Sequence, residues 1–209
     1  SGAKSIIFWP LFKKANFLEV LSSIADAAFN EVESVIIYDE EEHDFMSNSY
    51  LPSSLQSKKV ASYLELINHS GAEIDHSQPD AGCNIFTTSG TTRAPKFVLH
   101  SHRSISIHAS EVWRNLEPLI KSNAFFHTLP FCGVFGFNHF SAALSGARPN
   151  VIQSAFSARE AIDLIDRHKV HYISVTDDML LALLEADDRH PALPSLTCCG
   201  YGAFNFPPQ

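Results

Sequence analysis

TTSGTTRAPK, residues 87–96, lies between two short apolar runs, residues 83–86 and 97–99. Apolar runs on either side of a segment rich in glycine and hydroxyl residues predict two strands joined by a hairpin loop. Such a loop gathers backbone N–H groups, hydroxyls and the Lys96 cation, which suits the oxygens of a polyphosphate. Ser/Thr/Gly clusters between strands also form ordinary turns, so a plain turn stays the alternative. The segment is not a Walker A motif, because no Gly-Lys-Ser/Thr opens a helix.

After this segment the apolar pattern alternates between strands and helices. Strands are predicted at residues 124–129, 150–153, 170–175 and 196–199, and helices at 105–116, 137–146, 157–165 and 179–184. Ser157-Ala158-Arg159-Glu160 has the form of a capping box that starts the third of these helices. The alternation predicts an α/β fold, a parallel sheet covered by helices on both faces. Residues 130–136 and 200–204 would lie at the carboxyl ends of strands, where such sheets bind ligands.

The first part of the chain is less regular. A helix is predicted over residues 17–29, a strand over 34–38, an acidic surface excursion over 39–60, a short helix over 62–68 and a linker over 69–81. We therefore divide the chain at the start of the hairpin, into an N-terminal part, residues 1–82, and an α/β part, residues 83–209.

Composition narrows the class of protein. The residues are 45% hydrophobic and 18% charged with a net charge of −8, which is typical of a soluble globular protein and argues against a nucleic-acid partner. No apolar stretch is long enough to span a bilayer, and the first residues do not form a signal peptide. Cys83, Cys132, Cys198 and Cys199 lack metal-ligand spacing, and free thiols predict a cytoplasmic protein.

Residues 88–97 resemble the signature loop of the adenylate-forming enzymes, which include acyl- and aryl-CoA synthetases, luciferases and peptide-synthetase adenylation domains. The family pattern is Thr-Ser-Gly-Ser/Thr-Thr-Gly-x-Pro-Lys-Gly, and this chain departs from it at Arg93 and Phe97, where the family has glycine. The likeness continues toward Gln209. Residues 130–136, PFCGVFG, resemble the family's Pro-Leu/Phe-Phe-His-x-x-Gly without its histidine, and residues 201–203, YGA, resemble Gly-Gly-Ala.

The resemblance implies the N-terminal domain of an AMP-forming ligase, which activates a fatty or aryl carboxylic acid with ATP and Mg²⁺ and passes the acyl group to coenzyme A. It assigns the ATP phosphates to Thr88, Ser89, Gly90, Thr91, Thr92 and Lys96, the adenine to Tyr201, Gly202 and Ala203, and the acyl pocket to Phe131, Cys132, Gly133 and Phe135. It assigns no catalytic residue and no metal ligand within the chain. The family's Mg²⁺-binding Glu and the domain with its catalytic Lys are expected after Gln209, so we expect part of a large domain that is inactive alone.

Simpler roles stay open for several of these residues. Lys96 fits a solvated lysine at a strand edge, and the acyl-pocket residues fit an ordinary core. Cys132 has no His or Asp at a suggestive spacing, which argues against a nucleophile. His100, His102 and His108 crowd the end of the hairpin, where packing and capping are commoner than metal binding. Residues 135–139 hold no acid, whereas peptide-synthetase domains use an Asp in this stretch for the amino group, so a fatty or aryl acid is favoured over an amino acid.

Two functions of other classes also stay open. The chain fits a non-catalytic nucleotide-binding module, and it fits an interaction domain of a larger synthase. A reading frame that continues well past Gln209 favours the ligase, and binding of ATP analogues separates both nucleotide hypotheses from the interaction domain.

Overall fold

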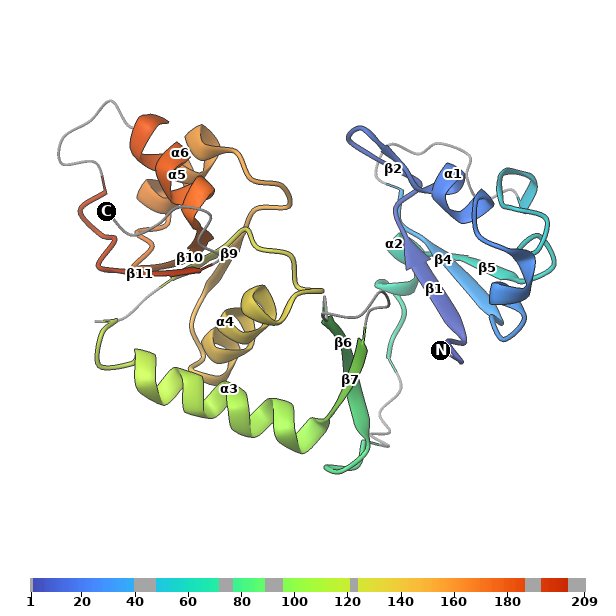
Figure 1. Cartoon of the computed structure of the whole chain (residues 1–209), viewed down its shortest axis with the longest axis horizontal. Coiled ribbons are helices and arrows are strands. Elements are labelled where there is room, and N and C mark those ends of the chain that lie inside the picture. The colour runs from blue at the N-terminus through green and yellow to red at the C-terminus, as the bar shows by residue number, and fades with distance from the viewer. Residues whose placement is uncertain are drawn as a thin grey trace. The chain divides into compact units, whose positions relative to one another are not determined.

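The computed structural model describes residues 2–39, 48–71, 77–88, 96–120, 124–186 and 193–202. The chain folds as two compact units, residues 1–75 and residues 76–209 (Figure 1). The division of the chain into domains at residues 82 and 83 stays a prediction. No helix in the ranges above is both long enough and apolar enough to cross a membrane.

The first unit is built on a three-stranded parallel sheet. Its strands lie in the order β1 (Ser5–Phe8), β4 (Ser34–Ile37) and β5 (Lys59–Ser62). Val35 and Ile37 of β4 point into a core with Phe29 and Leu55, which confirms the strand predicted at residues 34–38. We did not predict β1 or the small hairpin of β2 (Leu11–Phe12) and β3 (Ala15–Asn16). The surface excursion predicted over residues 39–60 is wrong in its last part, because Leu51 and Leu55 are buried in this core and β5 begins at Lys59.

The helix predicted over residues 17–29 is wrong in its length. Helix α1 (Phe17–Ser22) is capped by Asn16, whose side chain accepts hydrogen bonds from the N–H groups of Leu18 and Glu19. The Ser22 and Ser23 hydroxyls donate back to helix carbonyls, and residues 26–29 form a separate 3₁₀ turn. Serines compete with the helix backbone in this way, so the apolar periodicity outlasts the helix. The short helix predicted over residues 62–68 is α2 (Tyr63–Leu66).

The second unit contains the predicted parallel sheet. Its strands lie in the order β11 (Cys198–Gly202), β10 (Tyr172–Thr176), β8 (Phe125–His127) and β9 (Asn150–Ile152). All three pairings are parallel. Each strand is within a few residues of its predicted position. The strands do not lie in the order of the sequence, and β11, the last of them, is at one edge. This order is set by pairing between strands that are far apart in the sequence, so the sequence pattern did not predict it.

Helices cover both faces of this sheet, as predicted. Helices α5 (Ala158–Arg167) and α6 (Asp177–Ala186) pack on the face of Phe126 and Ile173. Helices α3 (His102–Leu116) and α4 (Val134–Ser145) pack on the face of Phe125 and Tyr172. Phe125 and Phe126 are neighbours in β8 and point to opposite faces, so two buried aromatic rings anchor the two helix layers.

The predicted hairpin is confirmed as two antiparallel strands, β6 (Gly82–Thr88) and β7 (Lys96–Ser101). The side chain of Arg103, at the start of α3, binds Asp80 with its Nε 2.7 Å from Oδ1 and a second nitrogen 3.0 Å from Oδ2. This bidentate pair ties the start of the hairpin to α3. One face of the hairpin buries Phe86, whereas Phe97 on the opposite face is 72% exposed.

The start of α5 differs from the predicted capping box. The Ser157 side chain makes no capping hydrogen bond. Instead, the buried side chain of Gln153 accepts from the Ser157 N–H at 3.3 Å, and its Nε2 donates to the Ser157 carbonyl at 3.1 Å and to Glu160 Oε2 at 2.9 Å. The Gln153 side chain therefore binds both backbone groups of Ser157 at the start of α5, and the Ser157 hydroxyl does not cap the helix.

Replacement of Gln153 should thus be far more costly than replacement of Ser157. We expect Gln153→Ala to lower the free energy of unfolding by about 2 kcal/mol, because it leaves buried polar groups without partners. Ser157→Ala should change it by less than about 0.5 kcal/mol. Urea unfolding of both variants measures the difference. A larger loss of unfolding free energy in Ser157→Ala than in Gln153→Ala would show that the Ser157 side chain caps α5.

Candidate functional site

The two segments predicted to bind the acyl group and the adenine meet at the carboxyl edge of the second sheet. Phe135 lies in the first turn of α4, and Tyr201 and Gly202 are the last two residues of β11. A Cβ atom built on Gly202 would lie 3.6 Å from Cε1 of Phe135, so the ring is in van der Waals reach of this glycine. The sheet order therefore brings together two segments that are far apart in the sequence.

The turn between β8 and α4 is tightly packed. Gly133 is the N-cap of α4, and its N–H donates to the Pro130 carbonyl at 3.1 Å. A Cβ on Gly136 would lie only 2.7 Å from the Pro130 carbonyl oxygen and 2.8 Å from that of Leu129. Only glycine lets α4 approach this backbone so closely, so Gly136 fixes the position of α4 and with it that of Phe135.

Beneath Phe135, His139 links α4 to the sheet. Its Nδ1 lies 2.9 Å from the Phe135 carbonyl oxygen, to which it donates in the Nδ1–H form. The ring stacks on Tyr172 at 5.4 Å between centroids and meets Phe135 edge-on at 5.1 Å. Burial lowers the pKa of His139, so the ring is neutral at neutral pH. The buried His139 ring thus holds Phe135 in place.

The other predicted acyl-pocket residues point in different directions. Phe131 stacks on Phe140 at 4.5 Å and meets His127 at 6.0 Å, so it belongs to a ring cluster over β8. Cys132 is exposed. The structure therefore brings Phe135 to Gly202, uses Gly133 as a helix cap and places Phe131 among packed aromatic rings.

His127 is a buried neutral histidine in this ring cluster. Its Nε2 lies 2.6 Å from Asn150 Oδ1, and the amide nitrogen of Asn150 donates to the Arg148 carbonyl, so the imidazole is the donor. Burial lowers the pKa of His127 from its ordinary value of 6.5 to about 4, although the Asn150 hydrogen bond raises it. The unfolded chain consequently binds this proton more readily than the folded chain does.

We expect the stability of the second unit to fall as the pH falls. Between about pH 7 and about pH 5, His127 should cost about 2 kcal/mol of unfolding free energy, because it must stay neutral below its ordinary pKa. His139, with a pKa shifted in the same direction, adds to the loss. His127→Gln should flatten the dependence, and His168→Gln, at an exposed position, should leave it unchanged. Denaturant unfolding over this range measures the slope, and an unaltered slope in His127→Gln would contradict the assignment.

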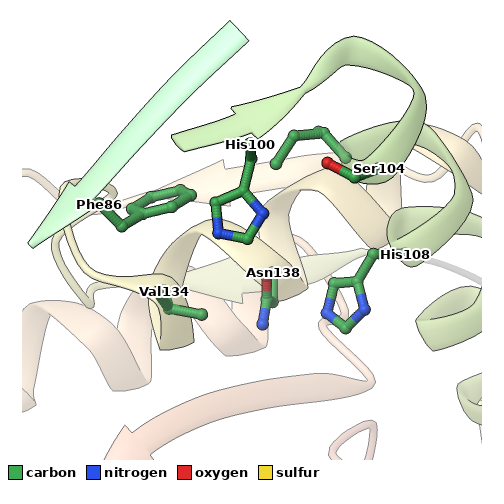
Figure 2. Close-up of a pocket in the computed structure, with 7 residues that line it drawn as sticks. Phe86, His100, Ser104, His108, Val134 and Asn138 are labelled. Carbon is green, nitrogen blue, oxygen red and sulfur yellow. The ribbon is translucent and has the colours of Figure 1, made fainter. Parts of the chain in front are cut away.

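A cavity of about 390 Å³ lies between the hairpin, α3 and α4 (Figure 2). Its lining comes from β6, β7, the first two turns of α3 and the first two turns of α4: Phe86, His100, Ser104, Ile105, His108, Val134 and Asn138. Of the three histidines noted in the sequence, His100 and His108 enter this cavity, whereas His102 lines a separate surface depression with Arg103. On α3 the lining residues 104, 105 and 108 lie on one face, and on α4 residues 134 and 138 do the same. The sequence does not show that these two faces are neighbours, whereas the tertiary structure does.

Comparison with known proteins identifies the family. The model of the AMP-binding enzyme family matches residues 1–209. The chain belongs to this family. It is 28% identical over 130 residues to 2-succinylbenzoate–CoA ligase of Bacillus subtilis and 32% identical over 105 residues to 4-coumarate–CoA ligase-like 6 of Arabidopsis thaliana. These matches cover 61% and 47% of this chain but only 26% and 18% of the relatives.

Solved structures of AMP-binding enzymes share the fold. An o-succinylbenzoate CoA synthetase from Bacillus subtilis, bound to its product analogue OSB-NCoA, matches with a TM-score of 0.69 and 22% identity. This match covers 99% of this chain and 45% of that one. The same protein in complex with ATP and magnesium ion matches with a TM-score of 0.62. The predicted fold class is therefore confirmed, and the chain covers 45% and 38% of these two solved chains.

The described residues of the predicted nucleotide site lie at the mouth of the hairpin loop and at the edge of the sheet. Thr88, the last residue of β6, pairs with Lys96, the first of β7, so an exposed lysine flanks the mouth of the hairpin loop. Ser89, Gly90, Thr91 and Thr92 lie outside the described residues, as do Ala203 and the side chain of Thr88. At the sheet edge, Gly202 lies beside Phe135 and the Tyr201 ring is exposed. Among the residues that the structure describes, no three His, Cys, Asp or Glu side chains gather to hold a metal ion.

Proposed function

We propose that the full-length protein joins a carboxylic acid to ATP and then transfers the acyl group to the thiol of coenzyme A. In the first step a carboxylate oxygen attacks the α-phosphorus and pyrophosphate leaves. In the second step the thiol sulfur attacks the acyl carbon and AMP leaves. The observation that supports this proposal is the closeness of Phe135 to Gly202: a Cβ built on Gly202 would lie 3.6 Å from the Phe135 ring, so a residue predicted for the acid lies near one predicted for the adenine.

Each predicted residue has a role in this scheme. Hydroxyls and backbone N–H groups of residues 88–92 would bind phosphate oxygens, and Lys96 would offset the charge that builds on them. Bound Mg²⁺ would neutralise further phosphate charge. Gly202 and Ala203 would lie along the adenine with Tyr201 beside it. Gly133 and Phe135 would border the acid, with Phe131 and Cys132 behind the same turn.

The acid is proposed to be aromatic or aliphatic and to lack an amino group. No acidic side chain lies between residues 135 and 139 to pair with an ammonium group. The two relatives at 28% and 32% identity are both named as CoA ligases, one of them for 2-succinylbenzoate. The proposed ligands are the acid, ATP and coenzyme A, and no nucleic acid takes part in the reaction. We further propose a cytoplasmic location, since Cys83, Cys132, Cys198 and Cys199 are all free thiols.

Acid-dependent release of pyrophosphate from ATP tests this function in the full-length protein. A panel of aryl, fatty and amino acids should give release with aryl or fatty acids, and added coenzyme A should give the thioester. Lys96→Ala should lower kcat/KM by about tenfold or more, and Lys58→Ala, in the first unit, should not. ATP binding without release would favour a non-catalytic nucleotide module, and loss of both would favour an interaction domain.

A further inference from the structure

The angle between the hairpin and α3 depends on a single joint in the chain. Ser101 is both the last residue of β7 and the N-cap of α3, with φ −83° and ψ 164°. The strand therefore passes into the helix without a linker. A small change in these two dihedral angles would turn the whole hairpin relative to α3, so other contacts are needed to fix its direction.

Pairing between the two strands does not fix this joint. Gly82 and Asn84 of β6 pair with adjacent residues of β7, so Cys83 between them is an extra residue and forms a β-bulge. A bulge interrupts the ladder of hydrogen bonds and bends its own strand. The ladder is consequently least regular at the base of the hairpin, where the chain enters α3.

Contacts with the segment before β6 hold the joint instead. The N–H of His102 donates to the Ala81 carbonyl at 3.2 Å. The N–H of Arg103 donates to the Pro79 carbonyl at 2.7 Å, and the Arg103 guanidinium binds Asp80 through the two hydrogen bonds described above. A bidentate ion pair is directional, because its two nitrogens must face the two carboxylate oxygens. The Asp80–Arg103 pair therefore restrains the angle of the hairpin as well as its distance from α3.

The apolar contacts of the hairpin restrain its angle less. Phe86 packs edge-on against Phe137 of α4, with 5.2 Å between the ring centroids. Such packing is non-directional and lets the rings tilt. On the opposite face, Phe97 and Leu99 are 72% and 66% exposed, so they add little support.

A tilt at the base grows toward the far end of the hairpin. Strand β6 rises about 3.3 Å per residue, so the pair of Thr88 with Lys96 lies roughly 20 Å from the pair of Gly82 with Ser101. Over this length, a rotation of about 5° at the base moves Lys96 by about 2 Å. A displacement of about 1 Å in a group that acts on reacting atoms can lower a rate about a hundredfold.

We propose that Asp80 and Arg103 are positioning residues: their ion pair holds the hairpin at the angle that puts Lys96 on the phosphate oxygens of ATP. The inference rests on the proposed function, in which Lys96 offsets phosphate charge. Arg103 acts through the hairpin, because over roughly 20 Å its own charge is screened at a Debye length of about 8 Å. The Arg103 guanidinium also lowers the pKa of Asp80, so both partners stay charged at neutral pH.

The test varies ATP and measures pyrophosphate release by the full-length protein, with the acid of the panel that reacts fastest. We expect Arg103→Gln to lower kcat/KM for ATP by about tenfold, because the phosphates then meet a displaced Lys96. The KM for the acid should change by less than about twofold. The melting temperature should fall by no more than about 2 °C, since an exposed ion pair adds little stability.

Two further variants separate position from charge. Arg114→Gln is the matched control, because Arg114 lies near the other end of α3 and binds Glu111 at 2.7 Å in another exposed ion pair. It should leave kcat/KM for ATP unchanged. The charge-reversed pair, Asp80→Arg with Arg103→Asp, should recover most of the activity that either single reversal loses.

Two outcomes would overturn the inference alone. One is an unchanged kcat/KM for ATP in Arg103→Gln while Lys96→Ala still loses activity, and the other is an equal loss in Arg103→Gln and Arg114→Gln. Absence of release with every acid would overturn the proposed function. The dissociation constant of the fluorescent analogue mant-ATP then tests the positioning role by itself. A rise of about fivefold in Arg103→Gln but not in Arg114→Gln would support it, and equal constants would overturn it too.

Discussion

Gly136→Val should lower the free energy of unfolding by about 4 kcal/mol, the largest effect that we expect from one substitution in this chain. A Cβ at this position meets two backbone carbonyl oxygens, those of Pro130 and Leu129, at 2.7 and 2.8 Å. Neither oxygen can move without breaking the turn between β8 and α4. The branched side chain would push α4 from the sheet and take Phe135 away from Gly202.

Gly133→Ala is the matched control in the same turn. A Cβ there lies 3.4 Å from the nearest atom, the Pro130 carbonyl oxygen, which is an ordinary contact. We expect this variant to lose less than about 1 kcal/mol, chiefly through the weaker N-cap. Urea unfolding followed by far-UV circular dichroism compares the two variants. Similar losses in both would show that the close approach of α4 does not set the stability of this unit.

Gly200→Ala should lower the free energy of unfolding by about 3 kcal/mol through a clash with Tyr172. The Tyr172 side chain lies across Gly200 of the neighbouring strand, and an added Cβ would lie 2.3 Å from its hydroxyl oxygen. That oxygen accepts a hydrogen bond from Ser174 at 3.1 Å, and burial raises the pKa of Tyr172 to about 12. The ring is almost fully buried against Phe125 and His139, so it cannot swing aside.

Removal of the hydroxyl should rescue this variant. With Tyr172→Phe the nearest atom to the new Cβ becomes the ring Cζ at 3.3 Å. We expect Tyr172→Phe alone to cost about 1 kcal/mol, since the Ser174 hydroxyl loses its partner, and the double variant to cost about 2 kcal/mol. The cycle would then show a favourable coupling of about 2 kcal/mol. Strictly additive losses would mean that the Tyr172 hydroxyl does not cause the loss in Gly200→Ala. Gly71→Ala is the control for the effect of alanine itself, because a Cβ there meets nothing within 4 Å.

The alternation of strands and helices could be predicted from the sequence because each element of the second unit carries its own periodicity. The faces of α5 and α6 follow from the local apolar pattern, Pro130 comes shortly after the end of β8, and Gly146 is the C-cap of α4. The same reasoning did not find β1 and β5, which are strands only because β4 pairs with both. Serine hydroxyls ended α1 early, an effect that apolar spacing does not report.

The candidate site, too, could be predicted only in part. Residues 87–96 could be recognised from their order alone, and the segments around Phe135 and Gly202 from their place after strands. The roles of His139 and His127 depend on burial and on partners brought by distant strands, so the sequence offered only isolated histidines. His100 and His108 drew notice as a crowded group, but their separation from His102 depends on the packing of the hairpin against α3 and α4.

Helix α4 shows Val134 and Asn138 to one neighbour and Phe135 and His139 to another. Val134 is 43% exposed, whereas His139 packs against both Phe135 and Tyr172. Residues 134 and 138 can therefore be substituted during evolution while the tightly packed residues around Gly136 and Tyr172 keep the fold.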